Sequence, residues 1–329
     1  MVKDLFSAIG KTPLVDLQRV IKRVDFRILA KLESLNPGGS VKDRPAFSMI
    51  KRGIESGRIG PDTVIIESSS GNMGIGLAQT CVSLGLRFIC VVDPKTTQQN
   101  IRILKAYGVT VDMVTTPDPQ TGEYLQARIN RVKSLLASVK NSYWPDQYSN
   151  EYNPAAHHLT MQEIVEDMNN EVDYLFCSTS TCGTIRGCVE YKRMRNLATK
   201  VYAVDALGSV IFGGQRARRL IPGHGAAVRP KLYQPGLADH QVHVSDLDCI
   251  VGCRRLARRE GLLVGGSSGA VISALAKVKD NIPPRSNVAL IFADRGERYL
   301  DTIYSDEWVE EHFGKVSYLW EDDEENFDA

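Results

Sequence analysis

Short apolar runs rich in β-branched residues alternate with amphipathic stretches of helical length along most of the chain. The strand-like runs are RILAKLE (27–33), TVIIES (63–68), LRFICVVD (86–93), TVDMVT (110–115), VDYLFC (172–177), VYAVDA (201–206) and NVALIFAD (287–294). The stretches between such runs repeat apolar residues at the three- to four-residue spacing of a helix. Strands that are apolar on both faces are typical of parallel sheets with helices on both sides. The pattern therefore predicts an α/β protein built on parallel sheets.

The strand–helix units fall into two groups, one over residues 37–146 and one over residues 147–315. A single hydrophobic core stops growing when the chain reaches about 250–300 residues. A chain of 329 residues therefore favours two α/β domains with a cleft between them. The last residues, 316–329, include the acidic stretch EDDEENFDA and few core residues, so we expect a disordered, solvated tail there.

Charge and hydropathy exclude several classes of function. The chain has 40 Lys+Arg against 39 Asp+Glu, a net charge of +1, which does not attract nucleic acid or anionic membranes strongly. No apolar stretch approaches the length of about 18 residues that spans a bilayer. The opening MVKDLFSAIG lacks the apolar core of a signal peptide. We expect a cytoplasmic protein without nucleic-acid or membrane partners.

Cysteine, histidine and arginine patterns have simple structural interpretations. The seven cysteines form an odd set without C-x-x-C spacing, and the six histidines show no metal-ligand spacing, so we expect neither a metal site nor a disulfide framework. Four arginines fall on one face of the helix predicted over 246–259, where we expect a solvated surface: Arg254, Arg255, Arg258 and Arg259.

Four loops rich in Gly, Ser and Thr stand where an α/β protein binds its ligands. Ligands in such folds lie beyond the carboxyl ends of strands, where helix N-termini present free N–H groups. The four loops are NPGGSVKDR (36–44), ESSSGNMG (67–74), STSTCGT (178–184) and GGSSGA (265–270). Each alone is also compatible with ordinary helix capping.

Together the loops suit one cofactor. STSTCGT offers successive N–H and hydroxyl groups at a helix start, a cradle for a phosphate monoester. The chain has no P-loop, and the glycines at 71, 74 and 76 have the wrong spacing for a dinucleotide fingerprint. Pyridoxal phosphate needs a Schiff-base lysine, a phosphate cup and a partner for its ring nitrogen. An early Lys42, an Asn-containing loop and a late phosphate cradle fit these needs.

In this order the loops resemble the signatures of the cysteine synthase and cystathionine β-synthase family, fold-type II pyridoxal-phosphate enzymes that catalyse β-replacement. IGKTPLVDL (9–17) and DRGERYL (294–300) match as well, so the resemblance covers about residues 5–310. It implies two parallel- or mixed-sheet α/β domains with the active site in their cleft, and a homodimer. The 1–36 segment would pack on the large cofactor-binding domain (147–315), and residues 37–146 would form the smaller, mobile domain.

The resemblance also implies roles for individual residues. Lys42 would be the catalytic lysine that carries the internal aldimine, and Asn72 would hydrogen-bond the phenolic oxygen of the cofactor. Ser267 would face the pyridine nitrogen, with Ser268 the less favoured choice. A neutral partner at that nitrogen favours β-elimination over transamination. The phosphate would be held by Ser180, Thr181, Cys182, Gly183 and Thr184, and the substrate α-carboxylate by Ser69, Ser70 and Gly71.

Departures from ordinary cysteine synthases point to one branch of the family. Met73 stands where those enzymes have Thr, and Ser180 and Cys182 occupy glycine positions of their phosphate loop. The longer motifs look closer to the N-(2-amino-2-carboxyethyl)-L-glutamate synthases. These transferases make a precursor of 2,3-diaminopropionate for siderophores of the staphyloferrin B type and for peptide antibiotics. They join O-phospho-L-serine to L-glutamate through an α-aminoacrylate and release phosphate.

The same resemblance nominates two substrate contacts, Arg128 and Tyr148, and it makes Lys42 the general base at the substrate Cα. Arg216, Arg218 and Arg219 are further candidates for the mouth of the site. Two alternatives stay open. One is a cysteine synthase that uses sulfide on O-acetylserine or O-phosphoserine. The other is an inactive regulatory or binding paralogue, against which the intact Lys42 argues.

Overall fold

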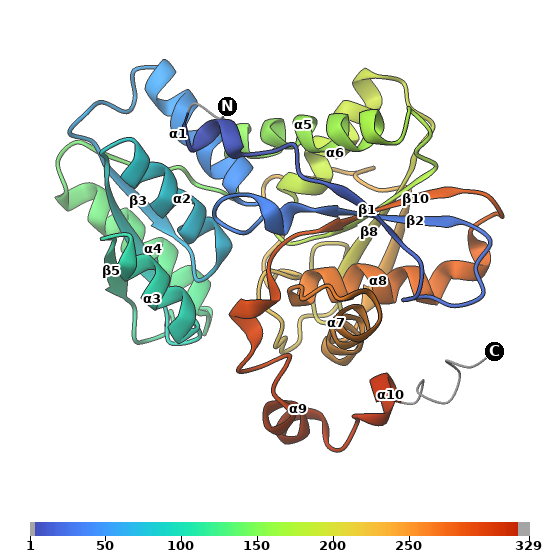
Figure 1. Ribbon diagram of the computed structural model, residues 1–329. Helices are drawn as coiled ribbons and strands as arrows, with labels where there is room; N and C mark the ends of the chain where they lie inside the picture. Colours follow the sequence, from blue (N-terminus) through green and yellow to red (C-terminus); the bar gives the residue numbers. More distant parts are fainter. Residues whose placement is uncertain (1–3, 322–329) are drawn as a thin grey trace.

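Two separate sheets organise the chain in the computed structural model, which describes residues 4–321. One sheet has six strands in the order β1-β2-β10-β7-β8-β9, and the other has four in the order β5-β4-β3-β6. The two sheets lie in neighbouring lobes, the smaller one on the left in Figure 1. The α/β fold predicted from the alternating pattern is confirmed.

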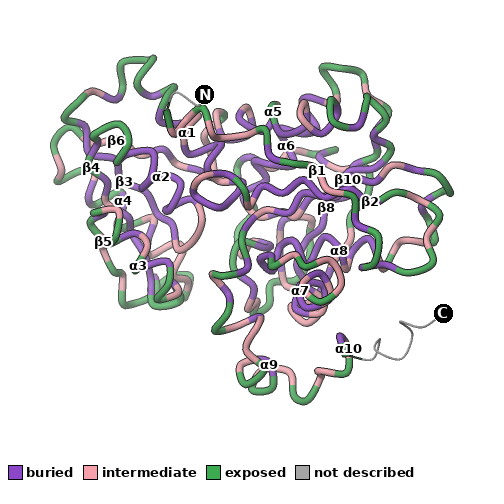
Figure 2. Tube along the Cα trace, in the orientation of Figure 1, coloured by how far each residue is buried: buried purple, intermediate pink, exposed green. Residues whose placement is uncertain are grey.

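The larger sheet is parallel except at one edge, where β1 runs antiparallel to β2. Its strands are β1 (Leu14–Leu17), β2 (Arg27–Leu32), β7 (Tyr174–Ser178), β8 (Lys200–Ala206), β9 (His240–Val244) and β10 (Asn287–Phe292). Its two faces bury against different helices: α5 (Tyr152–Asp167) and α6 (Gly183–Met194) on one, α7 (Asp246–Glu260) and α8 (Gly266–Val278) on the other. Figure 2 shows the resulting buried interior.

The smaller sheet is entirely parallel. Its strands are β3 (Val64–Ser68), β4 (Arg87–Val92), β5 (Thr110–Met113) and β6 (Ser142–Tyr143). One face packs against α1 (Asp43–Glu55), α2 (Asn72–Ser83) and α3 (Gln98–Ala106), and the other against α4 (Tyr124–Ser138). We retain as a proposal that each sheet is the core of one domain, over 37–146 and 147–315, with the 1–36 segment on the larger. The place of β1 and β2 in the six-stranded sheet supports this division.

Helix α1 connects the two lobes, because it packs against α2 on one side and against α5 on the other. A buried charge network anchors its first turn. The guanidinium of Arg44 lies 2.7 Å from carboxylate oxygens of both Glu33 and Glu163, and Lys31 Nζ lies 2.9 Å from Glu163 Oε2. Lys42, two residues before Arg44, is therefore held at a fixed place relative to the larger sheet.

The C-terminal segment differs from expectation. Helices α9 (Asp306–Phe313) and α10 (Tyr318–Glu321) follow the short 3-10 helix η4 (Gly296–Tyr299), and Trp320 is buried in the core. The expected tail therefore begins later than residue 316, and its remaining residues, 322–329, lie outside the described part of the chain. Three further 3-10 helices are η1 (Phe6–Ala8), η2 (Glu33–Leu35) and η3 (Lys279–Asn281).

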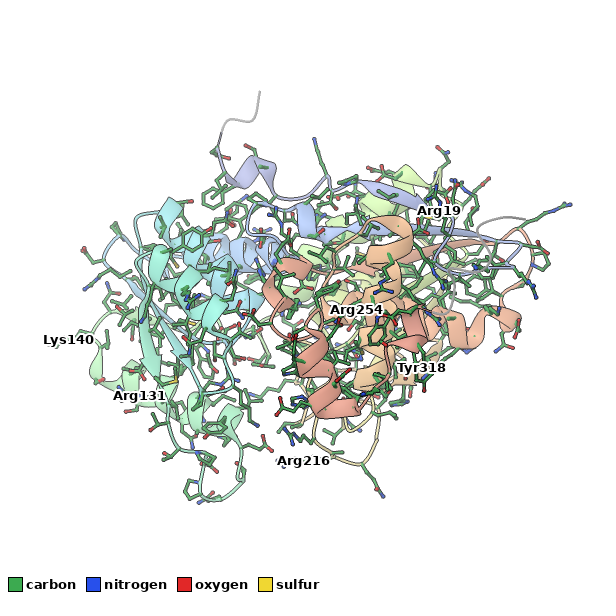
Figure 3. All side chains as sticks on the ribbon, turned by 60° about the horizontal axis from the view of Figure 1, so that its bottom comes forward. Arg19, Arg131, Lys140, Arg216, Arg254 and Tyr318 are labelled. Carbon is green, nitrogen blue, oxygen red and sulfur yellow. The ribbon has the colours of Figure 1, made fainter. Side chains whose placement is uncertain are left out.

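The solvated face expected on α7 is wrong for three of its four arginines, since Arg254 is buried and Arg255 and Arg259 are half-buried. Arg254 is buried, donates to the Ile303 carbonyl at 2.9 Å and lies 2.8 Å from the Asp306 carboxylate. Arg255 donates to the Leu319 carbonyl at 2.9 Å. These side chains hold the C-terminal segment against α7, and Figure 3 labels Arg254 and Tyr318 in that region.

Within residues 4–321, no helix has the length and apolarity to cross a membrane.

Candidate active site

A cavity at the carboxyl ends of β7 and β10 brings three of the four predicted loops together. Lys42 enters it from the loop before α1, Ser267 from the first turn of α8, and Ala293 from the end of β10. The segment from the end of β7 to the start of α6 lines much of the remainder, and Gly223 contributes from a later segment. The polar or small residues of that first segment are Ser178, Ser180, Thr181, Cys182, Gly183 and Thr184. This is the strand end at which α/β proteins bind ligands.

Lys42 carries the most reactive group of the cavity. Burial lowers the pKa of its amine, and the negative charges of Asp294 and Glu33 act against that decrease. A lysine with a lowered pKa has more of the neutral amine, which serves both as a nucleophile and as a general base. The neighbouring Val41 N–H donates to the Ala293 carbonyl at 2.7 Å, which fixes this loop against β10.

The loop 180–184 ends at the start of α6, whose first N–H groups have no acceptor within the helix. Such a terminus attracts an anion. Burial raises the pKa of the Cys182 thiol to about 12, so the side chain stays uncharged and does not repel an anion. Cys182 has a backbone φ of 67°, in the left-handed region that glycine normally fills.

A histidine that sequence reasoning did not select supports this loop from behind. His157, fully buried in α5, places Nε2 3.3 Å from the Thr184 hydroxyl and Nδ1 3.2 Å from the Thr160 hydroxyl. Burial, together with the charges of Lys42 and Arg44, keeps its pKa well below the ordinary value, so the imidazole is neutral. Its contact with Thr184 shows that His157 supports the 180–184 loop, and no local sequence motif indicates this role.

The two serines of GGSSGA have different surroundings. Ser268 accepts a hydrogen bond from the Ala293 N–H at 3.0 Å and so fastens α8 to the end of β10. Ser267 lines the cavity. The geometry thus favours Ser267 over Ser268 as a partner for a bound ring.

Asn72, the first residue of α2, lies beside the end of β10. Its Nδ2 donates to Asp294 Oδ2 at 2.7 Å, and its Oδ1 accepts from Arg298. Ser69 accepts from the Gly74 N–H at 2.9 Å and caps α2, while the Ser70 carbonyl accepts from Asn100 at 3.0 Å. The residues that line the cavity do not include Asn72, Ser69, Ser70 or Gly71, which lie between β3 and the start of α2 in the smaller lobe.

Arg128, on α4, and Tyr148, in the segment between β6 and α5, do not line the cavity either. Arg128 is buried in α4 with Nε 3.0 Å from Asp93 Oδ2. Burial raises the pKa of Tyr148, and the nearby Arg128 charge opposes the rise. The two side chains are therefore close enough to interact electrostatically.

Glu67 is a buried carboxylate that sequence reasoning missed. It accepts from Trp144 Nε1 at 2.9 Å, from the Ser68 N–H at 2.8 Å and from the Gln147 N–H at 3.2 Å. It thus ties the serine loop at the end of β3 to the segment that carries Tyr148. Burial raises its pKa to about 7. A charged residue within an otherwise apolar strand was the available signal.

Three polar contacts hold the 216–224 segment of the larger lobe. Arg216 forms an ion pair with Glu123 of the smaller lobe, and it lies near the boundary between the lobes (Figure 3). Arg219 donates to the His224 carbonyl at 3.0 Å, and Arg218 is exposed. His224 Nδ1 lies 2.8 Å from the Ser178 hydroxyl, and burial lowers its pKa to about 3. Among the described residues, no group of His, Cys, Asp and Glu could hold a metal ion.

Two curated proteins are similar to this chain over most of its length. The N-(2-amino-2-carboxyethyl)-L-glutamate synthase of Ralstonia nicotianae is 44% identical over 94% of this chain and 91% of its own length. The enzyme of the same name from Cupriavidus metallidurans is 43% identical over 93% of this chain and 91% of its own length.

Two solved structures share the fold. An O-acetylserine dependent cystathionine β-synthase from Helicobacter pylori has a TM-score of 0.86 at 34% identity, covering 93% of this chain and 99% of its own. O-acetylserine sulfhydrylase isoform 3 from Entamoeba histolytica has a TM-score of 0.85 at 32% identity, covering 92% of each chain. A family model of pyridoxal-phosphate dependent enzymes matches residues 5–294. The chain therefore belongs to the fold-type II pyridoxal-phosphate dependent enzymes, in the cysteine synthase and cystathionine β-synthase family.

Proposed function

We propose that the enzyme joins O-phospho-L-serine to L-glutamate by β-replacement, giving N-(2-amino-2-carboxyethyl)-L-glutamate and phosphate. The observation that carries the proposal is the identity of 43–44%, over more than nine tenths of the chain, to two synthases of that product. The cavity supports it, because it combines an amine of lowered pKa, an anion cradle at a helix start and a neutral hydroxyl.

The residues present fit pyridoxal phosphate. The α6 N-terminus with Ser180, Thr181, Cys182, Gly183 and Thr184 would hold the phosphate, and Ser267 would meet the ring nitrogen. When bound, the cofactor supplies an electron sink for bonds at the substrate Cα. Lys42 Nζ would take the Cα proton and return it after the new bond forms, a role that its lowered pKa supports.

The smaller lobe would bind the substrates. The α2 N-terminus with Ser69, Ser70 and Gly71 offers N–H and hydroxyl groups to an α-carboxylate. The Arg128 guanidinium and the Tyr148 hydroxyl, whose pKa burial raises, can both donate to an anion. We assign them to the phosphate leaving group or to a carboxylate of glutamate. Closure of this lobe would exclude water from the reacting atoms.

We further propose a cytoplasmic homodimer that supplies a 2,3-diaminopropionate precursor for siderophore or antibiotic synthesis. The near-zero net charge and the named product of the two relatives support this setting.

One assay tests the reaction. Purified protein is given O-phosphoserine with either glutamate or sulfide, and the products are read by mass spectrometry. We expect the glutamate adduct. Cysteine without an adduct would establish a cysteine synthase instead, and the lack of a Schiff-base absorption band in fresh protein would indicate an inactive paralogue. Lys42→Ala is expected to lose both the band and turnover.

A further inference from the structure

The segment DRGERYL (294–300) matches the family signature, yet no function has been attached to it. It follows β10 and includes η4, and two of its side chains reach the loops around the cavity. Asp294 is buried, and Arg298 is half-buried. These two residues contact three of the four loops.

The first loop is reached through Asn72, which belongs to the opposite lobe. Asp294 Oδ2 accepts from Asn72 Nδ2 at 2.7 Å, and Arg298 donates through Nη1 to Asn72 Oδ1. Tyr299, next in the chain, donates its hydroxyl to the same Asp294 oxygen. Both ends of the Asn72 carboxamide are therefore bonded across the boundary between the lobes.

The Arg298 side chain and the Asp294 backbone bind the loops that carry Lys42 and Ser267. Arg298 donates through Nη2 to the Gly38 carbonyl, and a Cβ on Gly39, whose φ is +81°, would lie 2.9 Å from that nitrogen. The Gly265 N–H donates to the Asp294 carbonyl at 3.1 Å, and a Cβ there would collide with Asp294 Oδ1. Glycine is needed at 39 and 265 so that the backbone can approach these two side chains.

The donor and acceptor roles leave one orientation for Asn72. A carboxamide has one acceptor oxygen and two N–H donors, and a guanidinium donates only. The oxygen must therefore face Arg298, which turns Nδ2 toward Asp294. Asp294 engages one of the two N–H groups. Among the described residues the other N–H makes no hydrogen bond within 3.5 Å, although the Tyr299 hydroxyl lies close enough for Asn72 to act on its pKa.

We propose that Asp294 and Arg298 are positioning residues that orient the Asn72 carboxamide so that its second N–H serves the phenolic oxygen of the cofactor. The inference rests on the proposed function and on the contact with the phenolic oxygen that the family resemblance implies for Asn72. Burial raises the pKa of Asp294, and the hydrogen bonds from Tyr299 and Asn72 and the charges of Arg298 and Lys42 act against the rise. Because the pair bridges the lobes, it also aligns Asn72 with the Lys42 loop.

A double-mutant cycle tests this. Apo protein is titrated with pyridoxal phosphate for the wild type, Asp294→Ala, Asn72→Ala and the double variant, and the dissociation constant and the absorption spectrum of bound cofactor are recorded. Each single change should weaken binding about tenfold, the size expected for one lost hydrogen bond to a charged group. If Asp294 acts through Asn72, the double variant binds within about twofold of Asn72→Ala. Losses that multiply to about 100-fold would overturn the proposal.

The cycle is repeated with Arg298→Met in place of Asp294→Ala, because methionine keeps the aliphatic part of the side chain. Arg298→Lys should recover part of the affinity that Arg298→Met loses. Arg295→Met is the matched control, since Arg295 is exposed and donates to the Ser34 carbonyl rather than to Asn72. Melting of each apo variant checks folding, and Asp294→Asn, which preserves volume, replaces Asp294→Ala if that protein does not fold. A control effect as large as that of Arg298→Met would also overturn the proposal.

The readout separates this inference from the proposed reaction. Wild-type protein that binds pyridoxal phosphate but makes no glutamate adduct would refute the reaction and leave the cycle interpretable. Multiplying losses in the cycle would refute the positioning role and leave the adduct assay intact.

Discussion

Arg44 and Glu33 form a two-pronged pair in the interior, with Arg44 Nε 2.7 Å from Glu33 Oε2 and Nη2 2.7 Å from Oε1. Both side chains are nearly inaccessible to solvent, at 3% and 0% exposure. The same guanidinium also binds Glu163 of α5. One arginine thus joins η2, α1 and α5 immediately beside the reactive lysine.

Removing that arginine should destabilise the fold. Arg44→Met would leave the Glu33 carboxylate buried without its cation, and breaking a buried pair in this way costs about 3–5 kcal/mol. Urea unfolding of the apo protein measures the loss. The control is Arg27→Met, which breaks the exposed Arg27–Asp16 pair and should cost no more than about 1 kcal/mol. Equal losses in the two variants would contradict the importance of the buried network.

The lowered pKa of Glu163 predicts that the folded protein loses stability at acid pH. Burial alone would raise its pKa, but hydrogen bonds from Arg44 and Lys31 lower it from 4.5 to about 2. A carboxyl whose folded pKa is depressed stabilises the fold above its unfolded pKa, and that stability is lost as the pH falls from about 4.5 toward 2. The free energy of unfolding should therefore decrease over this range, and less steeply in Glu163→Gln. Parallel pH profiles for the two proteins would rule this out.

The raised pKa of Glu67 predicts that stability decreases as the pH rises, the opposite of the effect of Glu163. Burial raises its pKa from 4.5 to about 7, so the folded protein keeps a proton that the unfolded chain releases above about 4.5. Its contribution to stability is therefore lost as the pH rises from about 4.5 to 7, by roughly 3 kcal/mol in total. Glu67→Gln should be more stable relative to wild type at pH 8 than at pH 5. A difference that is independent of pH would show that Glu67 ionises normally.

The fold was largely predictable because its central strands are buried on both faces. In β7, Tyr174 and Phe176 enter the core beneath α7 and α8, whereas Leu175 and Cys177 enter the core beneath α5 and α6. Such a strand is a continuous apolar run in the sequence. The three strands that the sequence pattern did not reveal, β1, β6 and β9, lie at sheet edges, where partial exposure weakens the signal.

The site was predictable where its chemistry is local and hidden where it is not. The Lys42, 178–184 and 265–270 loops each carry their own Gly/Ser signature, and the parallel strands bring them to one cavity. The Asn72–Asp294 bond joins residues 222 positions apart, so no local pattern indicates it. Charge pattern alone was misleading for Arg254, whose partners Ile303 and Asp306 come from a later segment.

Backbone geometry at Cys182 predicts an unusual order of substitution effects. Its φ of 67° is costly for any residue with a Cβ, by about 1–2 kcal/mol, so Cys182→Gly should be more stable than Cys182→Ala by about 1 kcal/mol. Cys188 is the control, because it is buried inside α6, where Ala should be more stable than Gly by about the same amount. Thermal unfolding of the four apo variants measures both orders. The same order at both positions would contradict the strain at Cys182.

The chain Thr160–His157–Thr184 predicts an effect on cofactor affinity. A phosphate only accepts hydrogen bonds, so a Thr184 hydroxyl that donates to it must accept from His157 Nε2–H, and Nδ1 must accept from Thr160. His157→Leu would free the Thr184 hydroxyl to rotate, and binding of pyridoxal phosphate to the apo protein should weaken about tenfold. Thr160→Val should weaken it less. His158→Leu is the control, because this neighbour pairs with Glu190 at 3.0 Å and should leave affinity unchanged. Equal losses of affinity in the two histidine variants would show that His157 only stabilises α5. An unchanged phosphorus resonance of the bound cofactor in His157→Leu would lead to the same conclusion.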